Sequence, residues 1–418
     1  MKTKETYKGR AWRSCWLCCH LVAALLLFCA CQHDDTTAEA SSLVLDAQVE
    51  QTVTRAGQTG VMDNTTLATT GFGVFIYGKN GTSNLFANQQ EVTYDNGDTP
   101  NTGALDDLHL HPRKWNYGTQ HDWAEDETFD FYAYAPYTTD FTSPGITYVT
   151  GLPDGPVIDY AVATDPAESV DLLWGVRGGT GLPWLNQTRD SNGGLVLFNF
   201  RHALAAIGLH VQAMIDKDND LIDFSDVSDP NDLLGTADLK VTLQSITITP
   251  KTSAFYDGGT LDLNNTAANT PLWANGSRSL SSLTLSDTQI NSSLISGSNG
   301  VLKTADDQVV IKDGHFFMLR PDEAQDYEVS VDYYVTYKTG DATYKRLDYT
   351  GSNAGKATFS QLPLVAGIRY WLNLVIGLKT VSVSVTAEDW RGETVNIEEL
   401  TERGTSANSS LSRRTDNR

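Results

Sequence analysis

Residues 327–338 read Tyr-Glu-Val-Ser-Val-Asp-Tyr-Tyr-Val-Thr-Tyr-Lys, and this stretch decides the fold class. Tyrosine or valine occupies every second position from Tyr327 to Tyr337, while polar residues and Tyr334 fill the positions between them. A helix would instead need apolar residues three and four positions apart. Because successive side chains of a strand point to opposite faces of a sheet, the stretch predicts a long, half-buried β-strand.

The same alternation recurs along most of the chain. It predicts strands in residues 43–49, 72–77, 129–137, 195–200, 207–211, 239–248, 370–376 and 381–385. Asn80-Gly81 predicts a hairpin turn after the strand at 72–77, and Pro136 is expected to end the strand at 129–137. Helical patterns are scarce, and no strand-helix-strand rhythm appears. The sequence therefore predicts an all-β fold built from antiparallel sandwiches.

The chain is long enough for more than one hydrophobic core. It has 418 residues, 40% of them hydrophobic, and a domain usually holds about 100 to 200 residues. An aspartate-rich stretch at 213–236 lacks apolar periodicity, and a new strand begins at Leu239, so a domain boundary is expected there. We predict a signal peptide in residues 1–30, a β-sandwich with its tether in 31–215, a second sandwich in 216–392 and a polar tail in 393–418.

The start of the chain has the features of an export signal. Basic residues precede the apolar run 21–30, which has the length of a signal-peptide core rather than of a membrane span. All five cysteines lie within residues 15–31, so no disulfide framework is expected in the folded part. The context Phe28-Cys29-Ala30-Cys31 resembles a bacterial lipobox, which predicts that Cys31 is lipidated and anchors the protein. The alternative is that Cys31 is an incidental residue of the signal peptide.

Acidic residues follow the lipobox directly. Gln32, His33, Asp34 and Asp35 resemble the signal that sends Bacteroidetes lipoproteins to the outer face of the outer membrane. Asp35-Thr36-Thr37 also resembles a short O-glycosylation motif of that phylum. The formal charge is −22, and removal of residues 1–30 would take away five basic residues and one acidic residue. A chain this acidic repels nucleic acid, so no nucleic-acid partner is expected.

Two segments have spacings that metal sites use. His109 and His111 point to the same side of an extended segment, but no third ligand accompanies them, which favours a polar loop. A calcium loop begins with alternate aspartates, as in Asp216, Asp218 and Asp220. The glycine and the final glutamate that this loop requires are missing, so an acidic linker between domains is the better interpretation. Neither a metal nor a cofactor is predicted.

The sequence lacks the common catalytic motifs. The sequence has no Gly-x-Ser-x-Gly elbow, phosphate-binding glycine loop or zinc-protease helix. His202 and His210 lie among apolar neighbours, so we interpret them as hydrogen-bonded strand residues rather than bases. Most tryptophans and tyrosines lie in strand patterns, which favours a core role over sugar stacking. We therefore predict that the protein is not an enzyme, although a carboxylate cluster formed by folding would support a hydrolase.

Several landmarks follow the lipobox in a fixed order. They are Thr54-Arg55-Ala56, Gly71-Phe72-Gly73-Val74-Phe75, Trp115, Phe129-Asp130-Phe131-Tyr132-Ala133-Tyr134-Ala135-Pro136-Tyr137, Phe200-Arg201-His202-Ala203-Leu204-Ala205, Phe317-Met318-Leu319-Arg320-Pro321, Gly367-Ile368-Arg369-Tyr370 and Trp390. This series resembles the fimbrillin family of Bacteroidetes, which includes the pilins of type V fimbriae. The resemblance extends from about residue 31 to residue 392.

The resemblance implies two transthyretin-like β-sandwich domains in tandem and an outer-membrane lipoprotein at the cell surface. It also implies a fimbrial subunit, of the stalk, the tip or an accessory position, that assembles by strand exchange. In that scheme a protease cuts after an arginine, the first strand leaves, and another subunit's strand fills the groove. Arg55 and Ala56 flank the candidate bond, and residues 43–53 would be expelled. Arg55 can equally be a loop arginine that no protease cuts.

The resemblance implies three kinds of partner. These are other fimbrial subunits, outer-membrane lipid held through Cys31, and ligands on host or bacterial surfaces. An alternative function is a surface glycan-binding lipoprotein of a polysaccharide-uptake system, which would share the anchor and the sandwiches. That alternative predicts exposed tryptophan and tyrosine pairs on one loop face.

Overall fold

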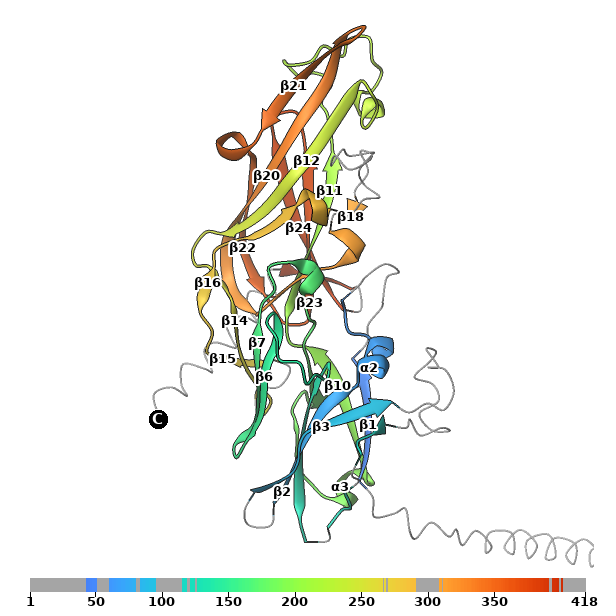
Figure 1. Cartoon of the computed structure of the whole chain (residues 1–418), viewed down its shortest axis with the longest axis vertical. Coiled ribbons are helices and arrows are strands. Elements are labelled where there is room, and N and C mark those ends of the chain that lie inside the picture. Colours follow the sequence, from blue (N-terminus) through green and yellow to red (C-terminus); the bar gives the residue numbers. More distant parts are fainter. Residues whose placement is uncertain are drawn as a thin grey trace, which may run out of the picture.

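The protein is built almost entirely of β-strands (Figure 1). The computed structural model describes residues 43–50, 60–79, 83–94, 115–118, 121–124, 126–265, 267, 270–290, 308–309, 311–390, 393–397 and 400. The helical elements within these residues are short: α2 (Asn64–Thr70), α3 (Arg189–Asn192), η2 (Pro166–Glu168), η3 (Pro230–Leu233), η4 (Asp287–Gln289), η5 (Lys312–Gly314) and η6 (Gly351–Asn353). The prediction of an all-β fold is confirmed.

The first sheet, called the N-terminal sheet, has the strand order β1-β10-β8-β5-β2-β3-β4, with β9 beside β5. Its strands are β1 (Val44–Val49), β2 (Phe72–Lys79), β3 (Ser83–Tyr94), β4 (Trp115–Asn116), β5 (Thr128–Ala135), β8 (Leu173–Arg177), β9 (Trp184–Gln187) and β10 (Leu195–His202). Strands β2 and β3 form the predicted antiparallel hairpin, although its turn residues Asn80 and Gly81 lie outside the described residues. Strand β5 ends directly before Pro136, as predicted.

A second sheet, called the β11 sheet, begins almost at once after β10. Only Ala203 and Leu204 separate β10 from β11 (Ala205–Ala213). The strand order is β18-β11-β23-β24-β25, with β19 also beside β11. The other strands are β18 (Gln308–Val309), β19 (Phe317–Leu319), β23 (Ile368–Ile376), β24 (Val381–Asp389) and β25 (Thr394–Val395). The two predicted C-terminal strands are therefore the antiparallel neighbours β23 and β24.

The third sheet, called the β20 sheet, lies beside the β11 sheet in the upper part of Figure 1. It consists of β12 (Leu239–Pro250), β17 (Leu283–Ser286), β20 (Asp322–Gly340), β21 (Thr343–Tyr349) and β22 (Gly355–Leu364). Strand β20 contains the ladder predicted from the sequence. Buried residues alternate with half-buried ones along it as far as Tyr337, and the buried set joins one large hydrophobic cluster with residues of β23.

A fourth sheet, called the bridging sheet, combines strands from before and after β11. Its order is β15-β14-β7-β6. Its strands are β6 (Gly145–Leu152), β7 (Gly155–Ala161), β14 (Gly258–Asp262) and β15 (Leu272–Ala274). A separate short pair, β13 (Phe255–Tyr256) and β16 (Arg278–Leu280), flanks β14 and β15 in the sequence. Because β7 pairs with β14, segments a hundred residues apart share one sheet between the two ends of the molecule (Figure 1).

The central strands β2 and β5 of the N-terminal sheet are buried on both faces. Phe72, Val74 and Ile76 of β2 belong to a hydrophobic cluster on one side, and Phe75 and Tyr77 belong to the larger cluster on the other side. Strand β2 therefore has buried residues at nearly every position, although its sequence also carries the alternation.

Two features of the sheets were not part of the sequence-based expectation. The pairs β1 with β10 and β11 with β23 are parallel, although the other ladders named above are antiparallel. In addition, the chain passes from the N-terminal sheet to the β11 sheet at Ala203 and Leu204. The aspartate-rich segment connects β11 to β12, both in the upper part of Figure 1. The domain division at residues 215 and 216 stays a prediction.

Candidate functional site

Strand β1 fills an edge position of the N-terminal sheet with an apolar face. Leu43, Leu45, Ala47 and Val49 are each 1% exposed and belong to the hydrophobic cluster that contains Phe198 and Phe200 of β10. The residues between them point to the opposite face, where Val44 is 44% exposed. The local alternation forms the strand, and burial of one face fixes its register.

One side of β1 is hydrogen-bonded to β10 in a parallel ladder. The register places Val44 beside Leu195 and Val49 beside Phe200. The N–H of Glu50 extends the ladder by donating to the carbonyl of Phe200 at 2.8 Å. Parallel strands need a long connection, and the chain between β1 and β10 contains most of the N-terminal sheet.

The other side of β1 meets side chains and isolated backbone groups. The Tyr117 hydroxyl donates to the carbonyl of Leu43 at 2.7 Å, and the N–H of Leu43 donates to the carbonyl of His121 at 2.8 Å. At the far end, the side-chain oxygen of Asn64, the first residue of α2, accepts from the N–H of Val49 at 2.9 Å. Within the described residues, β1 therefore has one strand neighbour, and the groups named here are hydrogen-bond partners on its other side.

Two polar pairs join β1 to β10 on the outward face. The amide nitrogen of Gln48 donates to the side-chain oxygen of Asn199 at 2.5 Å. One residue pair further along, Arg201 donates to both carboxylate oxygens of Glu50, through Nε and through Nη2 at 3.1 Å. Neither Asn199 nor its pairing was predicted, because Gln48 and Asn199 lie 151 positions apart in the sequence.

A buried carboxylate lies where the chain enters α2. Asp171 accepts from Nδ1 of His202, at 2.8 and 3.0 Å from its two oxygens, and from the N–H of Met62 at 2.9 Å. The His202 ring stacks on Trp390, with centroids 4.0 Å apart. The second histidine, His210, lies 3.0 Å from the side-chain oxygen of Asn373. Both histidines are therefore hydrogen-bonded strand residues, as predicted, whereas the role of Asp171 had no sequence signal.

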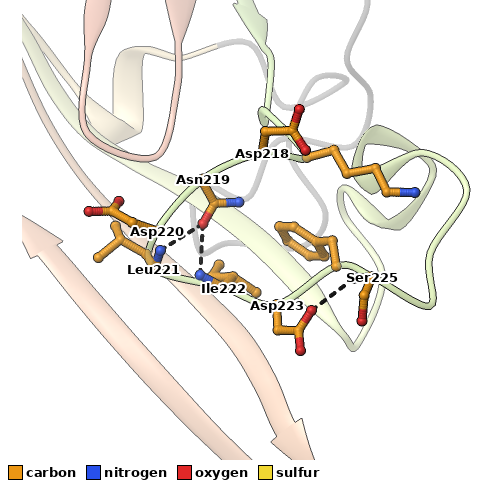
Figure 2. A pocket seen from close by; sticks show the side chains of 9 residues that line it. Asp218, Asn219, Asp220, Leu221, Ile222, Asp223 and Ser225 are labelled. Carbon is orange, nitrogen blue, oxygen red and sulfur yellow. Dashed lines mark hydrogen bonds between the residues drawn. The ribbon is translucent and has the colours of Figure 1, made fainter.

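The aspartate-rich loop forms an open hollow lined by residues 217–225 (Figure 2). Its side-chain oxygens turn back onto its own backbone, because Asp216, Asn219 and Asp223 each accept from N–H groups two or three residues onward. Asp220 instead pairs with Lys379 at 2.7 Å, and this hydrogen bond lowers the pKa of the Asp220 carboxyl. In the part of the chain that is described, no three His, Cys, Asp or Glu side chains are placed to hold a metal ion together.

The aromatic side chains lie mainly in the cores. The tryptophans among the described residues are all buried, namely Trp115, Trp123, Trp174, Trp184, Trp273, Trp371 and Trp390. Tyr148 and Tyr344 are about half exposed, at 52% and 50%, but they belong to different sheets. The core role predicted for the tryptophans is confirmed for this set. The exposed tryptophans that the glycan-binding alternative predicts are absent from it.

The sequence-predicted site residues lie outside the described residues. These are Cys31, Gln32, His33, Asp34, Asp35, Arg55 and Ala56, together with the histidine pair His109 and His111. The structure nevertheless places the two ends of the segment that contains Arg55. Glu50 follows β1, and Gly60 lies three residues before Asp63, which caps α2 by accepting from the N–H of Thr66 at 2.7 Å. Within the described chain, no helix is both long and apolar enough to span a membrane.

The family model described as fimbrillin-like matches residues 54–390. A fimbrial protein from Bacteroides vulgatus has a similar solved structure, with a TM-score of 0.56 and 18% sequence identity over 84% of this chain and 99% of that chain. Putative cell adhesion proteins from Bacteroides uniformis and Bacteroides ovatus align over 84% and 83% of this chain and 99% and 96% of their own. Their TM-scores are 0.38 and 0.36, and their identities are 16% and 12%. No curated protein matches the chain. Because the family match covers most of the sequence, the chain belongs to the fimbrillin-like family.

Proposed function

We propose that the protein is a structural and adhesive subunit of a cell-surface fimbria, in which β1 is a replaceable strand. The observation that carries the proposal is the position of β1. It is an edge strand with a fully buried apolar face, and a single neighbouring strand holds it within the described residues.

The energetics favour replacement over simple loss of β1. Burial of a leucine or valine side chain contributes about 2 kcal/mol, so a departing β1 gives up the burial of Leu43, Leu45 and Val49. It also exposes the phenylalanines of β10 and leaves one side of β10 without backbone partners. A strand donated by another subunit would restore both interactions, which is the physical basis of β-augmentation.

The proposal includes a route to the outside of the cell. Lipidation of Cys31 would anchor the chain in the outer membrane, since each buried methylene contributes about 0.8 kcal/mol. The acidic residues from Asp34 onward would direct the lipoprotein outward, and cleavage after Arg55 would separate β1 and the anchor from the rest. The fimbrillin-like family match and the similar fold of a fimbrial protein support this location.

Mass spectrometry of sheared surface filaments tests the proposal. We expect the protein in the filaments, with its first residue either lipidated Cys31 or Ala56. Recovery of the protein only as an intact, non-filamentous lipoprotein would contradict the fimbrial proposal.

Two substitutions separate the anchor from the processing step. Cys31→Ser should move the protein out of the membrane fraction, while Arg55→Ala should leave it lipidated and uncut. A control substitution, Arg189→Ala in the short helix α3, should change neither property. Unchanged membrane association of the Cys31→Ser variant would exclude the lipid anchor.

A further inference from the structure

We infer that Asn199 and Arg201 of β10 select the strand that occupies the β1 position. The selected strand comes from another subunit. It carries an amide side chain, followed two residues later by a carboxylate. The inference rests on the proposed replacement of β1. It adds the chemistry by which a correct donor strand, its register and its direction are distinguished from other apolar strands.

The backbone and the apolar face of β1 do not define a register sharply. Any strand with alternating apolar residues can pair with β10 and fill the same pockets, and a slip by two residues keeps the apolar face inward. The outward face lacks this ambiguity, because Gln48 meets Asn199 and Glu50 meets Arg201 at single positions. A slip by two residues would place Gln48 beside Arg201 and remove both pairs.

The side chain of Asn199 is held with its oxygen in position to accept a hydrogen bond from the neighbouring strand. A Cβ added at Gly178 would lie 2.1 Å from the side-chain nitrogen of Asn199, so the glycine provides the space in which this amide lies. With its nitrogen over Gly178, Asn199 directs its oxygen at Gln48. An amide side chain on the incoming strand satisfies that acceptor, whereas an apolar side chain would leave it without its present partner.

Arg201 recognises the side chain at the position of Glu50 through its planar guanidinium. Two donors on one edge of the guanidinium, Nε and Nη2, meet both oxygens of Glu50, a geometry that suits a carboxylate. The arginine side chain is 19% exposed and that of Glu50 is 47% exposed, so the pair lies at the rim of the site. A lysine at this position of a donor strand would place two cations side by side.

The parallel register adds directional information. Along β10, Asn199 comes before Arg201. Strand β1 runs in the same direction, with Gln48 before Glu50. A strand bound antiparallel to β10 would meet Asn199 and Arg201 in the reverse order. The selected pattern is therefore three alternating apolar residues, with the amide directly before the last of them and the acid directly after it.

The printed sequence contains the apolar-amide-apolar-acid pattern at two places, Ala47–Glu50 and Val395–Glu398. The second place lacks the preceding apolar alternation. With Asn396 opposite Asn199, Glu393 would face Val196, where β1 has the buried Leu45. A buried unpaired carboxylate is costly, so residues 393–398 of a second copy fit the position poorly. The stated pattern therefore points to a strand of a different subunit.

Peptide binding to the full chain tests the inference. A protease site placed within residues 51–59 would allow β1 to be cut free after folding, and fluorescent peptides would then compete for its position. We expect the peptide with the sequence of residues 43–50 to bind about fivefold more tightly than its Glu50→Lys version. A Val44→Lys peptide is altered at an exposed outward position away from Asn199 and Arg201, so it should bind like the unaltered peptide.

Substitutions of Arg201 and Asn199 provide the second part of the peptide-binding experiment. In the Arg201→Glu protein the preference should invert, so that the Glu50→Lys peptide binds more tightly than the unaltered one. In the Asn199→Leu protein, the preference for Gln48 over a Gln48→Leu peptide should disappear. A peptide of residues 393–400 should bind at least tenfold more weakly than that of residues 43–50.

The outcomes separate this inference from the proposed function. Uptake of all peptides with equal affinity, unchanged by Arg201→Glu and Asn199→Leu, would overturn the selection by the two residues while leaving strand replacement intact. Tighter binding of the 393–400 peptide would overturn the assignment to a different subunit. Failure of every peptide to bind would refute strand replacement itself.

Discussion

Asp171 shows how much one buried side chain can hold together. Its carboxylate accepts from His202 at the end of β10 and from the backbone of Met62 just before α2. His202 in turn stacks on Trp390, which follows β24 of the β11 sheet. A single carboxylate therefore links the segment between β1 and β2 to the place where the chain passes from one sheet to the next.

Replacement of Asp171 by alanine should lower the free energy of unfolding by about 3 kcal/mol. The physical reason is that the substitution leaves two buried donors, on His202 and Met62, without their partner. Urea unfolding measures the change. Asp341→Ala, in the exposed turn between β20 and β21, is the control and should change stability by less than about 0.5 kcal/mol. Equal unfolding midpoints for the two variants would contradict the role given to Asp171.

At the scale of the element, the two faces of β1 should respond differently to the same kind of substitution. Leu45→Ala removes a side chain that is 1% exposed and should cost about 2 to 4 kcal/mol, because the core around it cannot fully close the space. Val44→Ala, one position earlier and 44% exposed, is the matched control and should cost less than about 0.5 kcal/mol.

Hydrogen exchange locates the effect of these substitutions. Faster exchange in the Leu45→Ala protein should be concentrated in residues 44–49, since an edge strand can open before the rest of the sheet unfolds. A uniform increase throughout the N-terminal sheet would show instead that β1 and β10 open as one unit. That result would weaken the proposal that β1 is replaceable.

At the scale of the molecule, the buried cores of several sheets place many tyrosines in apolar surroundings. Burial raises the pKa of Tyr77 to about 12, and it also raises the pKa values of Tyr132, Tyr160, Tyr327 and Tyr370. The neutral phenols are therefore favoured in the folded state. The corresponding groups of the unfolded chain lose their protons near pH 10.

The stability of the protein should consequently fall as the pH rises above about 10. The unfolded state then releases protons that the folded state retains, so the contribution present below pH 10 is lost on the alkaline side. Urea unfolding at increasing pH, followed together with phenolate absorbance, measures the effect. Tyr132→Phe should make the decline shallower, whereas Tyr148→Phe, at an exposed position, should not. Ionisation of all tyrosines near pH 10 without unfolding would contradict the prediction.

The candidate site was only partly accessible to sequence reasoning. The alternation from Leu43 to Val49 predicted a first strand, and the resemblance to fimbrillins suggested that this strand leaves. The pairs of Gln48 with Asn199 and of Glu50 with Arg201 had no local signal, because each joins residues 151 positions apart. Cys31 and Arg55 remain predictions that depend on sequence motifs.

The sequence by itself determined where the strands with a clear alternation lie and that the fold is all-β, because a period of two is a property of neighbouring residues. It could not determine that β2 and β5 are buried on both faces, that β1 pairs in parallel with β10, or that the chain changes sheet at Ala203 and Leu204. Those features depend on which distant strand becomes a neighbour. Only the tertiary structure decides this, since the contacts that favour each arrangement form between segments that are remote along the chain.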